Sequence, residues 1–172
     1  MSILQNITNK IGNRSRSGDW FRTQLMEELD NDPNLNFNDM DTGGFSPGNL
    51  YQYTYNATTE QPYYDMYPLT YVIEMQPGGF LGCNLHYVKL KRRDDLAISL
   101  LNNSAQGAIA VPRNTLHRYL YTGVRGVPYR IPETEWSDVA QLPTEKFVDM
   151  RGIVIPKPVS YTHLTLPTKR IV

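Results

Sequence analysis

The sequence predicts an α+β protein. Residues 49–56 alternate tyrosine with other residues at a period of two, which is typical of a β-strand. Two further strand-like runs, residues 69–75 and 80–88, are separated by the turn sequence Pro-Gly-Gly at 77–79, and this spacing predicts a hairpin. Helical patterns precede and follow these strands without alternating with them, which favours α+β over α/β. We expect a small SH3-like β-barrel or a twisted antiparallel sheet, with N-terminal helices and two short helices downstream.

The composition is that of a globular chain and identifies no chemistry. Of the 172 residues, 40% are hydrophobic, which is enough for one core, and the mean hydropathy is −0.46. The formal net charge is zero, so composition gives no reason to expect nucleic-acid binding. A single cysteine excludes a disulfide framework and multi-cysteine metal modules. The apolar runs are too short to cross a bilayer.

The end of the chain needs separate treatment. Residues 159–168 read VSYTHLTLPT, which resembles the translation of an adapter used in sequencing libraries, and the flanking residues fit the continuation of that adapter. We therefore expect residues 158–172 to be an adapter-derived artefact and exclude them from functional argument. The genuine protein is expected to continue beyond Lys157.

Two short helices are predicted within residues 1–30. Asp19 can cap the second of them. The apolar positions of the two helices are Ile3, Ile7 and Ile11, and Phe21, Leu25 and Leu29. Helices this short are marginal alone, so we expect them to dock on the domain or on a partner. Residues 31–48, rich in Asn, Asp, Gly and Pro, are predicted as a linker to an α+β core domain at residues 49–157.

Two more short helices are predicted after the strands. The first begins at Asp94 or Asp95 and runs to Leu101. The second is capped by Asn114 or Thr115 and stops at Gly123. The remaining expected elements are short strands at residues 129–131 and 152–155 and a turn of helix around Trp136.

Candidate catalytic groups are few. Cys83 and His86 are a nucleophile and a base close together in sequence, but three residues apart on a strand they face opposite sides, and Cys83 fits a small core residue. Asp65 and Glu74 are the carboxylates of the strand region, and no spacing pairs them for acid–base chemistry. Gly78–Gly82 lacks the lysine of a phosphate-binding loop, and the histidines show no metal-binding spacing. The sequence gives no positive evidence for an enzyme, and we expect no cofactor.

Positive charge is concentrated between residues 89 and 130. One interpretation is a surface that faces DNA phosphates or a protein partner. The other is a solvated face that pairs with acidic segments of the same chain, since the net charge is not basic. The residues considered for DNA or partner contact are Lys89, Lys91, Arg92, Arg93, Arg113, His117 and Arg118.

The densest aromatic segment is PYYDMYP, residues 62–68. Its prolines restrict the backbone, and Tyr63, Tyr64 and Tyr67 add large amphipathic surfaces. The segment could serve as a stacking platform or a protein-binding surface. It could also be a rigid corner leading into the strand at residue 69, with Asp65 hydrogen-bonded to the turn. We favour the corner as its first role.

Several blocks occur in a recognisable order. They are GNLY at 48–51, PYYDMYPLTYVIE at 62–74 and GGFLGCNLHYV at 78–88, flanked by DWFR at 19–22, LHRYL at 116–120, Glu135-Trp136 and LPTEKF at 142–147. In this order the chain resembles a small virion protein of T-even-type tailed phages. That family follows the NLHY strand with a proline-containing turn, where this chain has Lys89-Leu90-Lys91.

The resemblance implies a virion structural or assembly protein (head-completion, neck, tail or baseplate) that acts by protein–protein contact. Such proteins are sometimes labelled DNA end protectors, so double-stranded DNA ends are an alternative partner beside other virion proteins. A metal-dependent nuclease is a second alternative, with Asp65, Glu74, Asp94 and Asp95 as its candidate carboxylates. The expected location is the host cytoplasm during assembly and then the virion, with no membrane and no small-molecule substrate.

Overall fold

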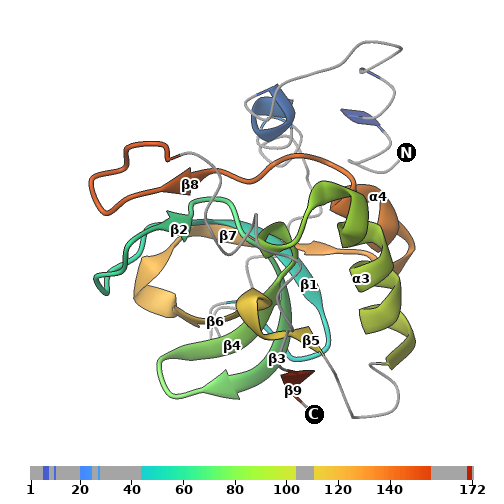
Figure 1. The fold of residues 1–172 in the computed structure, drawn as a ribbon, viewed down its shortest axis with the longest axis horizontal. Coiled ribbons are helices and arrows are strands. Elements are labelled where there is room, and N and C mark those ends of the chain that lie inside the picture. Colours follow the sequence, from blue (N-terminus) through green and yellow to red (C-terminus); the bar gives the residue numbers. More distant parts are fainter. Residues whose placement is uncertain are drawn as a thin grey trace.

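Helices and strands are mixed around one five-stranded antiparallel sheet (Figure 1). The computed structural model describes residues 6–7, 10, 20–24, 27, 44–103, 111–155 and 170–171. The strands in spatial order are β6 (Leu116–Leu120), β4 (Gly79–Asn84), β3 (Leu69–Gln76), β1 (Leu50–Tyr55) and β7 (Val124–Ile131). The α+β prediction is consistent with this mixture. The sheet is not closed into a barrel, so the SH3-like part of the prediction is unconfirmed.

The two edge strands follow each other in the chain. β6 and β7 lie at opposite edges of the sheet, yet only the three residues of the 3-10 helix η5 (Tyr121–Gly123) connect them. A residue spans at most about 3.6 Å, so the sheet must curl until its edges approach. Gly123 lies at this approach, where its carbonyl accepts the amide of Asn56 (2.8 Å) and an added Cβ would lie 2.6 Å from the ring of Tyr55.

Both faces of β1 are buried, each in its own core. Tyrosines at 51, 53 and 55 pack on one face in a mainly aromatic core, and Leu50 packs on the other in a mainly aliphatic one. The period of two in the sequence predicted this alternation. Phe45 is buried in the aromatic core, with its ring centroid 4.4 Å from that of Phe80. The segment predicted as a linker therefore contributes to the core at its end, while residues 31–43 lie outside the described residues.

The predicted hairpin is confirmed, with a shorter second strand. β3 and β4 pair antiparallel around a turn at Gly78, whose φ is +76°. β4 ends at Asn84, and the 3-10 helix η2 (Leu85–Tyr87) replaces the predicted strand to residue 88. Asn84 causes this change, because its side-chain oxygen accepts the backbone N–H of His86 (3.0 Å) and caps η2.

The first downstream helix begins earlier than predicted. α3 spans Leu90–Asn103, so the expected start at Asp94 or Asp95 is wrong. The side chain of Arg93 holds the first turn, because its Nε donates to the carbonyl of Val88 (3.0 Å) and its Nη2 to that of His86 (3.2 Å).

The second downstream helix is absent, and the prediction of a helix from residue 114 to Gly123 is wrong. Its place is taken by a 3-10 helix η4 (Arg113–Thr115), then β6, then η5. β6 pairs with the free edge of β4, with Cys83 opposite Leu116. Leu116 and Tyr119, three apart on a strand, reach opposite faces and pack in the two different cores. Tertiary pairing therefore overrides the local helical spacing.

The remaining elements are short. They are β2 (Tyr64–Asp65), β5 (Val111–Pro112), the 3-10 helix η6 (Glu133–Glu135), α4 (Trp136–Ala140), β8 (Phe147–Val148) and β9 (Arg170–Ile171). β2 pairs with β8, and β5 with β9. Instead of the strand expected at 152–155, a single antiparallel bridge joins Val154 to Val148. The helical turn predicted around Trp136 is confirmed as α4. The indole N–H of Trp136 donates to the carbonyl of Ile131 (3.0 Å).

The described N-terminal residues dock on the domain. Ile7 and Phe21 are buried in the aliphatic core, and Trp20 packs against it. The expectation of docking is met at these positions, whereas Ile3, Ile11, Leu25 and Leu29 lie outside the described residues. No helix among the described residues has the length and apolar character needed to cross a membrane.

Candidate functional site

One residue of the predicted basic surface, Arg93, is buried and cannot contribute to it. Lys91 and Arg92 are exposed in the first turn of α3, and Lys89 is half-buried just before it. Arg93 is completely buried, and its Nη1 donates to Oε2 of Glu145 (2.9 Å). Arg93 therefore supports the fold and lies away from any exposed basic surface.

The other predicted basic residues lie on β6 and η4. Arg113 is exposed on η4, which the side chain of Asn114 ties to η2 through the carbonyl of Tyr87 (2.8 Å). His117 is half-buried against the Tyr87 ring, 4.0 Å between centroids, and burial lowers its pKa. Arg118 is exposed one residue along β6, where it donates to the carbonyl of Pro77 (2.7 Å). His117 and Arg118 leave the strand on opposite faces, so the predicted contact set does not form a single patch.

The three tyrosines predicted to form an aromatic partner surface also point to different places. Tyr64 is buried and packs edge-on against Tyr55. Tyr63 is half-buried and stacks on Tyr87, whereas Tyr67 lies 5.4 Å below the guanidinium of Arg22. They form no common platform. The alternative interpretation, a rigid corner, fits, since the Asp65 carboxylate accepts the backbone N–H of Tyr67 (3.0 Å).

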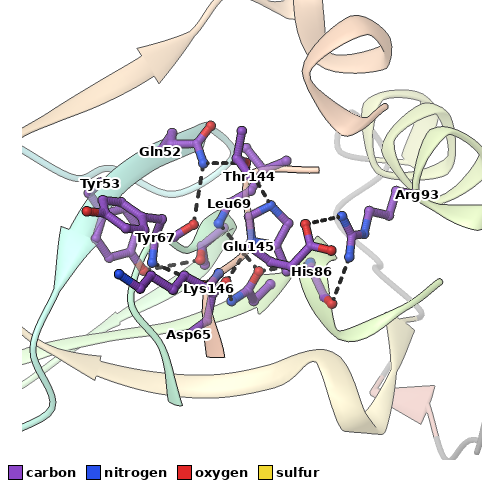
Figure 2. Close-up of polar contacts among 12 residues, drawn as sticks. Gln52, Tyr53, Asp65, Tyr67, Leu69, His86, Arg93, Thr144, Glu145 and Lys146 are labelled. Atoms are coloured by element: carbon purple, nitrogen blue, oxygen red, sulfur yellow. Dashed lines mark hydrogen bonds and ion pairs between the residues drawn. The ribbon is translucent and has the colours of Figure 1, made fainter. Parts of the chain in front are cut away.

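Asp65 is the centre of a buried polar network (Figure 2). Its Oδ1 accepts the backbone N–H of Tyr67 and that of Lys146 (3.2 Å). Its Oδ2 accepts the side-chain amide of Asn84 (3.1 Å) and lies 2.6 Å from Nδ1 of His86. Burial alone would raise the pKa of Asp65, but attraction to His86 and the hydrogen bonds outweigh burial and hold the pKa below its ordinary value.

His86 connects Asp65 to Thr144. The Nε2 atom of His86 lies 3.2 Å from the hydroxyl oxygen of Thr144, and that oxygen also accepts the side-chain amide of Gln52 (2.9 Å). Which of these two groups donates depends on the tautomer and charge of the imidazole. A hydroxyl, an imidazole and a carboxylate in line is the arrangement that activates a nucleophile in acyl-transfer enzymes.

The side chains of Asp65, His86 and Thr144 are all buried. Asp65 is 1% exposed, and His86 and Thr144 are 0% exposed, so the hydroxyl is shielded from solvent. The arrangement fastens the irregular segment 142–146 (the strap) across η2 and β2. Asp65, His86 and Gln52 each hydrogen-bond to the strap, as Figure 2 shows.

Two arginines complete the attachment of the strap. Arg93 pairs with Glu145, and attraction to His86 and the bond from Arg93 hold the pKa of Glu145 below its ordinary value in spite of its burial. Arg22, from the N-terminal segment, donates through Nη1 to the carbonyls of Thr144 (3.2 Å) and Glu145 (2.7 Å). The strap therefore joins the sheet, α3 and the N-terminal segment.

Sequence reasoning missed the Asp65–His86 pair. It correctly separated Cys83 from His86: the Cys83 thiol donates to Thr115 Oγ1 (3.3 Å), and burial raises its pKa to about 12. It found no acid–base partner for Asp65, because the partner is 21 residues away on a 3-10 turn that was predicted as strand. The available signal was positional: Asp65, His86 and Thr144 each lie inside one of the resemblance blocks.

The carboxylates considered for a nuclease do not form a cluster that could share a metal ion. Both oxygens of Asp65 are engaged by four donors, while Glu74 lies exposed on β3 and accepts from Gln76 (2.9 Å). No group of three or more His, Cys, Asp or Glu side chains within the described residues could hold a metal ion. Comparison of the chain with family models, with curated proteins and with solved structures finds no match.

Proposed function

We propose that this chain is a structural or assembly protein of a tailed-phage virion and acts by protein–protein contact. The observation that carries the proposal is where the resemblance blocks meet. PYYDMYP supplies Asp65, GCNLHY supplies Asn84 and His86, and LPTEKF supplies Thr144 and Glu145. Asp65 hydrogen-bonds to Asn84 and His86, and His86 also to Thr144. Glu145 joins this network through Arg93, which also donates to the carbonyl of His86. Residues from these blocks thus maintain the fold, as expected of a protein that acts through its shape.

We also propose that the curled sheet is an SH3-like barrel left open. The supporting observation is the spatial strand order β6-β4-β3-β1-β7, with a single turn of 3-10 helix between the two edge strands β6 and β7. That connection forces the first and last strands of the spatial order toward each other. Such a core presents loops and short helices around a rigid sheet, which suits a docking module.

Mass spectrometry of purified particles tests the virion role. The protein is expected in particles at a fixed ratio to a major virion protein, and this ratio should survive repeated density-gradient purification. Reproducible absence from particles that are produced by cells expressing the chain would contradict the proposal.

A DNA-end partner remains a second candidate because of one observation. The first turn of α3 contains no acidic residue, and Lys91 and Arg92 are exposed there without an ion pair to any described residue. Cations at the N-terminal end of a helix oppose the helix dipole, so they are retained at a cost that an anionic partner would offset. The test is the salt dependence of binding to duplex ends, described in the Discussion.

A further inference from the structure

Large apolar side chains gather on one exposed hairpin. Within the part of the chain that the structure describes, the large hydrophobic residues that are exposed are Ile98 (43%), Met150 (40%), Ile153 (50%) and Val154 (61%). Three of the four lie within five residues, on the turn that follows β8. Single exposed apolar residues are ordinary, whereas several on one projecting turn are a feature of contact surfaces. Successive residues point to opposite faces, so Ile153 and Val154 give the hairpin apolar surface on both sides.

The tip of this hairpin, residues 149–153, is held rigid by Asp149. Its Oδ1 accepts the backbone N–H of Arg151 (2.8 Å) and of Ile153 (3.0 Å), and its carbonyl accepts that of Gly152 (2.9 Å). Gly152 has a φ of +79°, which a side chain would disfavour. The apolar side chains are thus presented in one backbone conformation, so a partner would not have to order them.

The base of the hairpin is anchored in the domain. The backbone N–H of Ile155 donates to the carbonyl of Phe147 (3.0 Å), and both residues pack with Tyr87 and Tyr63. In Figure 1 the tip beyond β8 stands out at the left margin, away from the sheet. The hairpin is therefore a rigid projection with an apolar surface.

A partner is expected to contact the side chains of this hairpin and not to pair with its backbone as an added strand. The hydrogen bonds from Asp149 to Ile153 and from Ile155 to Phe147 face β8, which leaves the backbone groups of Val154 on the outer edge. An added strand would find no further backbone donor along this outer edge, because Pro156, two residues after Val154, has no N–H.

The charge on the tip indicates the chemistry of the partner. The Arg151 side chain is 78% exposed and uses Nε and Nη2 to bind Asp149, so its Nη1 amino group is directed to no other described residue. The Asp149 carboxylate is already engaged, and its pKa is lowered by hydrogen bonds from Ile153 and Arg151. The Asp149 carboxylate of a second copy would be engaged in the same way, so a symmetric contact between two tips offers Nη1 no open carboxylate of the tip and disfavours self-association there.

We propose that the hairpin of residues 147–155 is a preformed docking element that places Met150, Ile153 and Val154 in an apolar groove, bordered by carboxylates, on a different virion protein. This inference rests on the proposed virion role. It adds the surface that is used and the chemistry of the partner.

Site-directed photo-crosslinking in phage-producing cells tests the inference. The photoreactive residue p-benzoylphenylalanine replaces Met150 or Val154, with Ile98 as the control because it is exposed to a similar degree on α3. We expect positions 150 and 154 to attach to the same single protein, at an apolar segment flanked by Asp or Glu, and position 98 not to do so. The double substitution Ile153→Ser and Val154→Ser, tested with the probe at 150, should lower the yield about tenfold or more.

The outcomes separate this inference from the virion role. Attachment to another copy of this chain, attachment to the same proteins as position 98, no attachment, or an unchanged yield in the double variant would each overturn the docking element. If particles contain the protein and the crosslinks fail, only the docking inference falls. If the crosslinks succeed and particles lack the protein, a partner of the stated chemistry stands and the virion assignment falls.

Discussion

Asp65 and His86 form a completely buried pair, with 2.6 Å between Oδ2 and Nδ1, that joins β2 to η2. Both groups are shielded from solvent, and each also binds the strap, Asp65 through the amide of Lys146 and His86 through the hydroxyl of Thr144. The pair is thus the point at which three distant segments are fixed to one another.

Asp65→Asn should destabilise the protein strongly. The variant keeps the shape of the side chain but removes the charge that the surrounding donors need, and removal of one partner of a buried pair typically costs about 3–5 kcal/mol. Urea unfolding followed by circular dichroism measures the loss, and Asp95→Asn, on the exposed side of α3, is the matched control. A loss no larger than that of the control would contradict the structural role of Asp65.

Stability should fall in acid because of Asp65 and Glu145. The folded pKa of each lies below its ordinary value, 3.8 for Asp65 and 4.5 for Glu145. Their contribution is therefore fully present above about pH 4.5 and is lost as the pH falls through the folded pKa values. Urea midpoints from pH 7 to pH 3 should decline, and the decline should be smaller in Glu145→Gln. An equal decline in that variant would show that Glu145 takes no part.

The sheet was largely predictable and the network was not. The tyrosine alternation and the Pro-Gly-Gly turn are local patterns, and the strands they predicted exist as β1, β3 and β4. The helix predicted to end at Gly123 was wrong because pairing with the edge of β4 decides the structure of residues 116–120. His86 lies 21 residues from Asp65 and 58 from Thr144, and no local pattern encodes contacts at those separations.

Thr144→Val should weaken the attachment of the strap. Valine fills the same space without the hydroxyl, so it leaves the amide of Gln52 and Nε2 of His86 without their partner, at a cost of about 1–3 kcal/mol. Thr144→Ser keeps the hydroxyl and should lose less. Equilibrium unfolding of the two variants gives the comparison, and a serine variant less stable than the valine variant would oppose this account.

Glu135→Met should stabilise the protein. Glu135 is 6% exposed, and neither of its carboxylate oxygens has a hydrogen-bond partner among the described residues. A buried polar group without a partner costs about 1–3 kcal/mol, and methionine has a similar length without that cost. The melting temperature should rise, with Glu133→Met, two residues away and exposed, as the control. A fall in melting temperature would show that Glu135 has a stabilising role.

The DNA-end candidate depends on Lys91 and Arg92, because Arg93 is occupied by Glu145, Val88 and His86. If the first turn of α3 contacts phosphates, each contact should add about 0.9 to the magnitude of the log–log salt slope on duplex DNA. The double variant Lys91→Ala/Arg92→Ala should then reduce that slope by about 1.8 if both residues contact phosphate. Its matched control is Arg125→Ala/Arg130→Ala, which removes the same charge from exposed positions on β7.

Arg93 must stay unchanged in this experiment, since its loss would open the buried network and confuse unfolding with lost binding. Affinity for blunt duplex ends, measured by fluorescence anisotropy at several salt concentrations, provides the slopes. Affinity should not depend on sequence, because phosphate contacts carry no base information. If the wild type does not bind duplex ends at low salt, or if the control lowers the slope as much as the double variant, the first turn of α3 is not a DNA contact. Its cations then remain available to acidic protein partners.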